Sequence, residues 1–413
     1  MNVISDHESR VSCYSRQFRT VFQSGKGGWL KDVNGKNYLD CFLGSGALNY
    51  GHNDAELIKS LQEYISSDGV VQGLDMATTS KQKFLKDFHE IILVPRQLEY
   101  RVQLAGPGGA NAVEAAIRLA RKITGRTRVI YFENSYHGMT EGARSVSDMI
   151  KDQVNSCRSD NLCLPFRCES ESEDRGSRLS NMPEHEFESA AAVIIETVQI
   201  EGGVRVADKE WLQEIQRLCN LYGVLLIIDD IQAGIGRSGS FFSFESSGIC
   251  PDLVILSKSL SGLGLPLSIV LIKPQYDVWD ACEYTGTFRG LNYAFVTASA
   301  AMDKFWRDGE LENAVNVGSV FLFGALKNMQ PVAYTLPIRR KGLVFGLEFP
   351  RQEQAVCVQQ KAFSDGLLVG ICGKNKNVIK IMPSLLSSSG ELTHAVETLR
   401  NAIGSVSLNR ASN

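Results

Sequence analysis

The 413-residue sequence has no hydrophobic run long enough to cross a membrane and no large excess of either charge. Its longest apolar stretches, such as GVLLII, fall far short of the roughly 20 residues that a spanning helix needs. Residues 1–10 are polar and lack the apolar core of a signal peptide. The formal net charge is −3, so no electrostatic argument favours nucleic acid or an anionic membrane as a partner. These absences predict a globular protein of the cytoplasm.

The sequence also lacks the paired cysteines that are typical of a zinc site. Of its ten cysteines, only Cys157, Cys163 and Cys168 lie close together, and their spacing differs from the usual C-x₂-C pair. Several others lie within apolar stretches, where a small buried thiol is the ordinary interpretation. We therefore expect neither a metal site nor a disulfide framework.

Strongly apolar runs of strand length alternate with helical segments along the middle of the chain. They cover residues 128–132, 191–198, 223–230, 252–258 and 267–273. Such runs, separated by helices, predict an α/β fold with a mostly parallel sheet covered on both faces. Helical spacing of apolar residues predicts helices from about 54 to 125. The segment 150–186 is rich in Ser, Asp, Glu and Arg, and we expect a surface loop there.

The two ends of the chain have a different character. Residues 12–50 indicate extended segments, with a hairpin turn at Asn34-Gly35. After about residue 300 the chain is helical, and then offers a pair of strands in KGLVFGLEF and NVIKIMP. We predict that an N-terminal segment, 1–53, packs with a small α+β domain, 301–413. The large domain, 54–300, lies between them in the sequence.

Polar side chains follow several of the apolar runs, at the strand ends where parallel α/β sheets bind their ligands. Asp229, Lys258 and Glu196 each stand at the end of such a run. Tyr136 and His137 follow the first run by a few residues. Each residue also has an ordinary interpretation. A strand-end lysine can reach solvent, Asp229 can cap a turn, and the other side chains can be structural.

A glycine-rich turn, GPGG at 106–109, precedes a helical segment and leaves backbone N–H groups for an anion. Alone it could be any tight turn, and it lacks the G-x-G-x-x-G pattern of dinucleotide sites. A phosphate cradle, a buried carboxylate, an aromatic ring and a lysine amine together indicate pyridoxal phosphate. The lysine would form a Schiff base with its aldehyde, and the carboxylate would keep its ring nitrogen protonated.

From about Arg10 to Leu386 the chain resembles the class III (omega) aminotransferases, which are fold type I pyridoxal-phosphate enzymes. The most specific block is LLIIDDIQAGIGRSGSFFSFESSGICPDLVILSKSLSG. The resemblance implies that Asp229 pairs with the pyridinium nitrogen, Gln232 approaches the ring hydroxyl, and Lys258 binds the cofactor. It also implies a large, mostly parallel sheet domain flanked by helices, and a smaller α+β domain.

Further motifs carry further implied roles. GPGGANAVEAAIRLAR is similar to the family's phosphate turn, with Gly109 and Ala110 in the contacting positions. YHG matches its aromatic-His-Gly motif, which makes Tyr136 the stacking ring, with His137 beside the cofactor. GTFRG resembles the segment whose Thr reaches the cofactor phosphate of the neighbouring subunit. This resemblance implies a homodimer with shared active sites, and gives that role to Thr287.

The substrate end of the site is also implied by resemblance. ETVQIEGG is similar to a family stretch with two active-site carboxylates, matching Glu196 and Glu201. VIKIMPSLL offers Lys380 where many class III enzymes place an Arg for the substrate carboxylate. We expect Glu201 and Lys380 to bind the substrate, and Asn49 and Tyr50 of LNYGH to line the pocket, although a structural role is an equal alternative for the last two.

Several segments, including GALNYGHN and GLGLPLSIVLIKP, resemble the diaminobutyrate–2-oxoglutarate transaminases. These enzymes transfer the amino group of L-glutamate to L-aspartate 4-semialdehyde, giving L-2,4-diaminobutyrate and 2-oxoglutarate. The expected catalytic residues are Lys258, Asp229 and Glu201. The chain departs from the family at Asp230, where Glu is common, and at Ile200, where Gly is usual. The alternatives are a 4-aminobutyrate or ornithine aminotransferase, a racemase or mutase with the same cofactor, and a non-catalytic binding relative.

Overall fold

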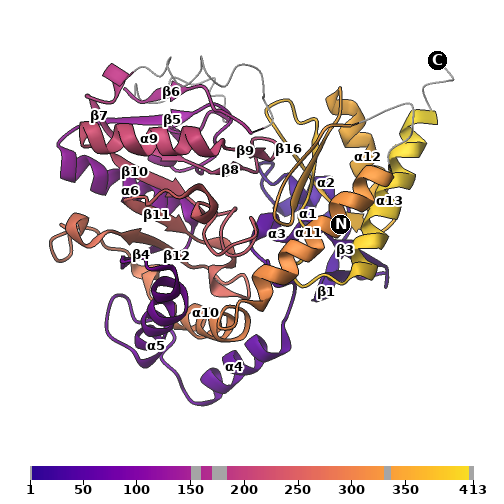
Figure 1. Cartoon of the computed structure of the whole chain (residues 1–413). Coiled ribbons are helices and arrows are strands. Elements are labelled where there is room, and N and C mark those ends of the chain that lie inside the picture. The colour runs from indigo at the N-terminus through magenta and orange to yellow at the C-terminus, as the bar shows by residue number, and fades with distance from the viewer. Residues whose placement is uncertain (1, 150–159, 170–183, 330–335, 409–413) are drawn as a thin grey trace.

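The computed structural model describes residues 2–149, 160–169, 184–329 and 336–408, and a seven-stranded sheet forms its centre (Figure 1). The strands, in spatial order, are β4 (Arg101–Gly106), β12 (Ser268–Ile272), β11 (Leu253–Leu256), β10 (Leu225–Asp229), β7 (Ala190–Ile195), β5 (Arg128–Phe132) and β6 (Leu162–Leu164). The five strands from β11 to β6 are parallel, whereas β12 is antiparallel to both of its neighbours. The prediction of a mostly parallel sheet is confirmed.

Helices cover both faces of this sheet, which explains why its strands are apolar throughout. Successive residues of a strand point to opposite faces. Leu225 and Ile227 of β10 accordingly belong to the cluster that packs on α6 (Gly109–Thr124), whereas Leu226 and Ile228 belong to the cluster that includes α9 (Lys209–Tyr222). The sheet is thus fixed between two apolar layers, and its strand ends remain open for a ligand.

We expected helices from about 54 to 125, but this region also contains a strand. It contains α4 (Ala55–Ser66), α5 (Thr79–Asp87) and α6, but β4 lies between the last two. β4 is an outer strand of six residues, and only Val102 and Leu104 supply its alternating apolar pattern. An alternating apolar pattern of only six residues is difficult to recognise between two longer segments with helical periodicity.

The N-terminal strands share a sheet with the C-terminal part of the chain. β1 (Phe22–Lys26), β2 (Trp29–Asp32) and β3 (Asn37–Asp40) form an antiparallel meander, and β15 (Leu367–Leu368) adds to β3 in parallel. Gly35 lies in the turn between β2 and β3 with a φ of 84°, which glycine adopts without strain. The hairpin turn expected at Asn34-Gly35 is therefore present.

A second four-stranded sheet lies in the C-terminal part. Its order is β13 (Ile338–Lys341), β14 (Val344–Glu348), β17 (Val378–Ile381) and β16 (Gly370–Cys372). β14 and β17 are the strand pair expected from KGLVFGLEF and NVIKIMP, and they pair antiparallel. The helices of this part are α11 (Glu310–Asn328), α12 (Gln352–Ser364) and α13 (Ser389–Leu408), whereas α10 (Asn292–Phe305) packs on α4 and α5. Figure 1 shows α11, α12 and α13 on the side opposite the seven-stranded sheet. The division of the chain after residues 53 and 300 stays a prediction.

The polar segment 150–186 and two expected absences can be compared with the structure. Most of the polar segment 150–186 lies outside the described residues, and within the rest of it β6 forms the edge of the large sheet. No helix in the described ranges is long and apolar enough to cross a membrane. Those same ranges contain no group of side chains that could hold a metal ion.

Candidate active site

A cavity of about 320 Å³ opens beyond the carboxyl ends of β5, β7, β10 and β11. Its wall includes the sequence-predicted residues Gly109, Ala110, Tyr136, His137, Glu196, Asp229, Gln232 and Lys258. Residues from four separate strand ends and one helix start therefore meet around one space. This is the edge at which α/β sheets bind their ligands.

The last residue of β10 brings a carboxylate into the cavity. Oδ2 of Asp229 lies 2.6 Å from Nδ1 of His137, and both side chains are buried. Oδ1 of Asp229 accepts a hydrogen bond from the backbone N–H of Ile231 at 3.1 Å. The carboxylate is thus held in one orientation from two directions. Nε2 of His137 is buried and has no hydrogen-bond partner in the part of the chain that the structure describes.

Lys258 begins a tight 3₁₀ turn, Lys258–Ser261, directly after β11. Its backbone φ is 50°, in the left-handed region that non-glycine residues rarely adopt. Burial, together with the neighbouring Lys380, lowers the pKa of Lys258 to about 8, although Glu201 and Asp229 favour the charged amine. A lysine with a pKa in this range is unprotonated in part near neutral pH, as nucleophilic and basic lysines require.

Glu196, which follows β7, has a different electrostatic environment. Oε2 of Glu196 accepts a hydrogen bond from the backbone N–H of Tyr136 at 3.0 Å. Burial and the nearby Asp229 raise the pKa of Glu196 well above its ordinary value. Glu196 therefore fixes the segment that carries the Tyr136 ring, and its surroundings favour the neutral carboxyl. The ring itself remains partly exposed at the cavity wall.

Glu201 and Lys380 form an ion pair beside this cavity. Lys380 lies on β17 and is almost fully buried, whereas Glu201 follows β8 (Val198–Gln199). Nε2 of Gln232 donates to Oε1 of Glu201 at 2.8 Å and so joins the pair to the cavity wall. Burial alone would raise the pKa of Glu201, but Lys380 and Lys258 outweigh it and lower the pKa to about 2. Glu201 is therefore ionised at any physiological pH.

The glycine-rich turn leads into α6, a helix of 16 residues whose N-terminus faces the cavity. The first N–H groups of a helix have no partner within the helix, so they attract an anion. A side chain at Gly109 would meet Cδ1 of Ile231 at 2.7 Å, and one at Gly138 would meet Cβ of Ala110 at 2.6 Å. Glycine at these positions lets the turn and the start of α6 pack closely against neighbouring side chains, which suits a cradle for a phosphate.

Comparison with known proteins decides the family. The chain matches the profile of the family described as Aminotransferase class-III over residues 11–403. The chain belongs to the class III aminotransferases. A diaminobutyrate–2-oxoglutarate transaminase of Nocardia farcinica is 45% identical to this chain over 98% of it and 94% of its own length. A protein of the same name from Halalkalibacterium halodurans is 44% identical, over 98% and 96%.

Solved structures agree with this family at the level of the fold. A transaminase from the marine bacterium Virgibacillus superimposes on this class III aminotransferase with a TM-score of 0.86, at 21% identity over 99% of each chain. The ornithine aminotransferase of Toxoplasma gondii gives a TM-score of 0.83, at 22% identity over 98% of this chain and 94% of its own. The prediction of a fold type I transferase is confirmed.

Class III aminotransferases use pyridoxal phosphate, and the cavity of this member fits that cofactor. The N-terminus of α6 suits the phosphate, and the buried carboxylate of Asp229 suits a protonated ring nitrogen. The amine of Lys258 suits the aldehyde, and Nε2 of His137 leaves one buried polar atom for a bound group. The residues present therefore account for the phosphate, the ring nitrogen and the aldehyde of the cofactor, whereas Nε2 of Gln232, the residue expected at the ring hydroxyl, donates to Glu201.

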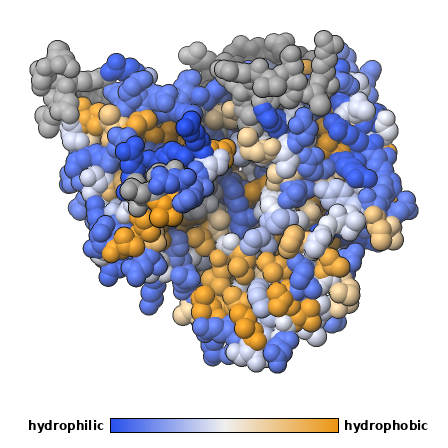
Figure 2. Space-filling model, turned by 180° about the vertical axis from the view of Figure 1, so that it is seen from behind, coloured by the Kyte–Doolittle hydropathy of each residue, from blue (hydrophilic) through white to orange (hydrophobic). Residues whose placement is uncertain are grey.

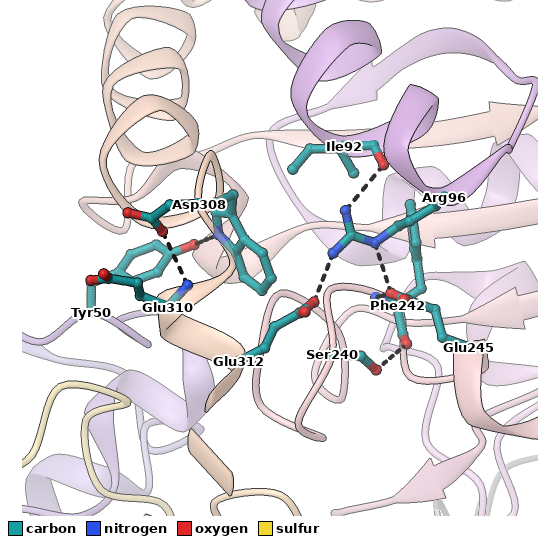
Figure 3. Close-up of polar contacts among 10 residues, drawn as sticks. Tyr50, Ile92, Arg96, Ser240, Phe242, Glu245, Asp308, Glu310 and Glu312 are labelled. Carbon is teal, nitrogen blue, oxygen red and sulfur yellow. Dashed lines mark hydrogen bonds and ion pairs between the residues drawn. The ribbon is translucent and has the colours of Figure 1, made fainter. Parts of the chain in front are cut away.

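Two of the predicted pocket residues point elsewhere in this class III aminotransferase. Oδ1 of Asn49 accepts hydrogen bonds from the guanidinium of Arg237 at 2.9 and 3.3 Å. The hydroxyl of Tyr50 (Figure 3) accepts from the indole N–H of Trp306 at 2.7 Å. The ring of Tyr50 stacks on Phe305. Neither side chain lines the cavity. Interior partners already occupy both side chains, which favours the structural alternative, and a substrate role for Asn49 and Tyr50 stays a prediction.

Thr287 lies outside the cavity of its own chain, on an exposed 3₁₀ turn, Thr287–Arg289. Its role toward a neighbouring subunit stays a prediction. Sequence reasoning missed Met139, Ile231 and Ala233, which also line the cavity. In the sequence, the only indication that these three residues line the cavity is that they lie close to predicted polar site residues. It also missed Ser45, whose hydroxyl donates to Oε1 of Glu201 at 3.0 Å, since a serine in a small-residue turn gives no local pattern.

Proposed function

We propose that this class III aminotransferase transfers the amino group of L-glutamate to the terminal carbon of L-aspartate 4-semialdehyde, giving L-2,4-diaminobutyrate and 2-oxoglutarate. Several relatives that bear the name diaminobutyrate–2-oxoglutarate transaminase, at 40–45% identity over 98% of this chain, support this reaction. The observation that carries the proposal is the ion pair of Glu201 and Lys380 beside the amine of Lys258. It places one anion and one cation where an amino acid's second polar end would bind.

The chain's own residues divide the chemistry between them. Bound pyridoxal phosphate supplies an electron sink that lowers the cost of removing a proton from the amine-bearing carbon. Nζ of Lys258 takes that proton as a base and delivers it again as an acid, which its pKa of about 8 allows near neutral pH. Asp229, oriented by His137, holds negative charge against the cofactor ring while electrons move into it.

The two substrates differ in the charges they bring to the Glu201–Lys380 pair. Diaminobutyrate that reacts through its terminal amine has an ammonium and a carboxylate at its far end. Glutamate that reacts through its α-amine has only a carboxylate there. Lys380 matches the carboxylate of both, and Glu201 matches the ammonium of diaminobutyrate alone. Because Lys380 is a point charge and lacks the two-pronged geometry of arginine, the carboxylate can approach it from more than one direction.

We also propose that the enzyme is a homodimer in which Thr287 contributes to the partner's site. Residues 70–76 pair with the segment around Thr287, since the N–H of Gly73 donates to the carbonyl of Gly290 at 3.0 Å. The two segments expose Val70, Val71, Leu74, Met76 and Phe288. Figure 2 shows apolar side chains gathered over the lower part of the molecule, where Figure 1 places α4, α5 and α10. Apolar surface gathered in this way is typical of an interface.

A half-reaction on the holoenzyme tests the substrate proposal. Addition of L-glutamate, or of L-2,4-diaminobutyrate, should convert the cofactor to its amine form and release the corresponding carbonyl product. Failure of both amines to convert it would contradict the proposal. Conversion by 4-aminobutyrate or ornithine alone would indicate those aminotransferases. Inversion of an amino acid without any carbonyl product would indicate a racemase, and a chain that binds no cofactor would indicate a non-catalytic relative.

A further inference from the structure

A left-handed turn lies next to the active site, in the short element α3 (Leu43–Gly46). The φ angles of its four residues are 49°, 57°, 59° and 86°. L-amino acids avoid this conformation because Cβ approaches the following carbonyl, and two of these residues, Leu43 and Ser45, are not glycine. A run of left-handed residues survives only where the surroundings hold it, and such strain is concentrated at functional sites.

Both ends of the turn are held by buried side chains. Oδ1 of Asp40 accepts hydrogen bonds from the backbone N–H groups of Phe42 and Leu43, at 2.9 and 2.7 Å. At the other end, the hydroxyl of Ser259 donates to the carbonyl of Gly46 at 2.8 Å. Ser259 directly follows the predicted catalytic lysine. The turn is therefore fixed relative to the reacting centre.

The turn presents Ser45 to the substrate end of the site. Its hydroxyl donates to Oε1 of Glu201 at 3.0 Å, and its carbonyl accepts from Nε2 of Gln232 at 3.0 Å. Gln232 and Lys380 donate to that same oxygen, Oε1. Three donors thus converge on one carboxylate oxygen. Oε2 of Glu201 has no hydrogen bond among the residues that the structure describes.

We propose that Ser45 is a positioning residue that holds Oε1 of Glu201, so that Oε2 is available to the far ammonium group of a diamino-acid donor. This inference rests on the proposed function. Glutamate has no second ammonium group and does not need Oε2. Ser45 should therefore affect the choice between the two amino donors, and not the chemistry at Lys258, with which it makes no contact.

Three variants separate positioning from stability. Ser45→Gly removes the hydroxyl and also relieves the left-handed strain, since glycine adopts this conformation freely. Ser45→Ala removes the hydroxyl and keeps the strain. Gly44→Ala is the matched control: it keeps the hydroxyl but adds a Cβ at a φ of 57°, where the nearest atom, Cβ of Ala47, lies at 3.6 Å. The site stays intact in this control, while the turn becomes more strained.

The readouts are kcat/KM for L-2,4-diaminobutyrate and for L-glutamate, with the melting temperature of each holoenzyme. Both Ser45 variants should lose roughly five- to twentyfold with diaminobutyrate and less than about threefold with glutamate, as expected for one lost hydrogen bond to a charged group. Ser45→Gly should melt at or above the temperature of Ser45→Ala. Gly44→Ala should melt lower than the parent and keep the parent's donor ratio.

An unchanged donor ratio in both Ser45 variants would overturn the inference. The inference would also be overturned if the donor ratio of Gly44→Ala changed as much as that of Ser45→Gly. The change would then come from a disturbed turn and not from the lost hydroxyl, which Gly44→Ala retains. In both cases the parent enzyme still uses both donors, and the proposed function stands. If the parent converts its cofactor with neither donor, the proposed function fails and this inference fails with it.

Discussion

A lysine amine is a useful base only when its surroundings bring its pKa close to the working pH. At Lys258 burial does this, and Lys380 adds to the effect, while three carboxylates limit it. The carboxylates are in turn differentiated by their partners. Glu201 is ionised by its contact with Lys380, whereas burial beside Asp229 favours the neutral form of Glu196. The pKa values of two neighbouring carboxyl groups are thus shifted in opposite directions within one site.

Asp230 directly follows Asp229 but points to the other side of the strand. Its Oδ2 accepts a hydrogen bond from the backbone N–H of Ser243 at 2.9 Å, and its buried Oδ1 has no partner among the described residues. Burial raises the pKa of Asp230 to about 7, and the carboxylates of Asp229 and Glu245 add to the rise. An ionised Asp230 is therefore a cost to the folded state.

The sign of the resulting pH dependence follows directly. An acid with a higher pKa in the folded than in the unfolded state makes the protein less stable as the pH rises between the two values. For Asp230 that window runs from 3.8 to about 7. The melting temperature of Asp230→Asn, relative to the parent, should therefore increase between about pH 5 and about pH 8. A constant difference across this range would show that the carboxyl has an ordinary pKa.

At the level of single residues, the sequence indicated those that end apolar strands. Lys258, Asp229 and Glu196 stand out because a polar side chain after a buried run needs a reason. For Asn49 and Tyr50 the sequence left a pocket role and a structural role open, because a buried polar group satisfied by interior partners has the same local sequence as a pocket residue. Nothing in the sequence could reveal their partners, which are distant in the chain.

At the level of elements, continuous apolar runs predicted the central strands correctly, whereas β4 was missed. No pattern in the sequence predicted which elements contact one another. Arg96 ends the helical stretch after α5, and its guanidinium donates to Glu245 at 3.0 Å, to Glu312 of α11 at 2.7 Å, and to the carbonyl of Ile92 at 3.1 Å (Figure 3). The two glutamates are 149 and 216 positions away in the sequence.

Arg96 therefore links three elements, and its loss should destabilise the fold. Arg96→Met would leave two partly buried carboxylates without their cation, and should lower the free energy of unfolding by about 2–3 kcal/mol. Arg101→Met is the matched control, since Arg101 is 64% exposed and pairs with Asp277 at 3.2 Å. It should cost less than about 1 kcal/mol. Urea unfolding measures both, and equal losses would contradict a linking role for Arg96.

At the level of the whole molecule, the seven-stranded sheet positions one half of the site and the C-terminal sheet the other. Asp229 ends β10 and Lys258 follows β11 of the first, and Lys380 lies on β17 of the second. The general α/β architecture was predictable because long apolar patterns repeat along the chain. Its assembly as a homodimer is implied only by the resemblance of GTFRG, because a surface that meets a second copy has no composition or periodicity that sets it apart from other exposed surfaces.

The proposed homodimer can be tested at its apolar surface. Phe288 is 66% exposed beside Thr287, and Phe288→Asp should shift the mass measured by light scattering toward the monomer and reduce activity. Val320→Asp is the control, because Val320 on α11 is similarly exposed, at 68%, but lies on a different element. The control should retain the parent's mass. A monomeric parent, or equal behaviour of the two variants, would contradict the proposal.

The central claim is that Lys258 removes a proton from the carbon bearing the terminal amine of diaminobutyrate, while Glu201 and Lys380 hold the other end. Incubation of the holoenzyme with 2-oxoglutarate and diaminobutyrate labelled with ¹⁵N only at the terminal amine tests it most directly. The label should appear in glutamate, and Lys258→Ala should transfer none. Unlabelled glutamate, formed from the α-amine, would contradict the account.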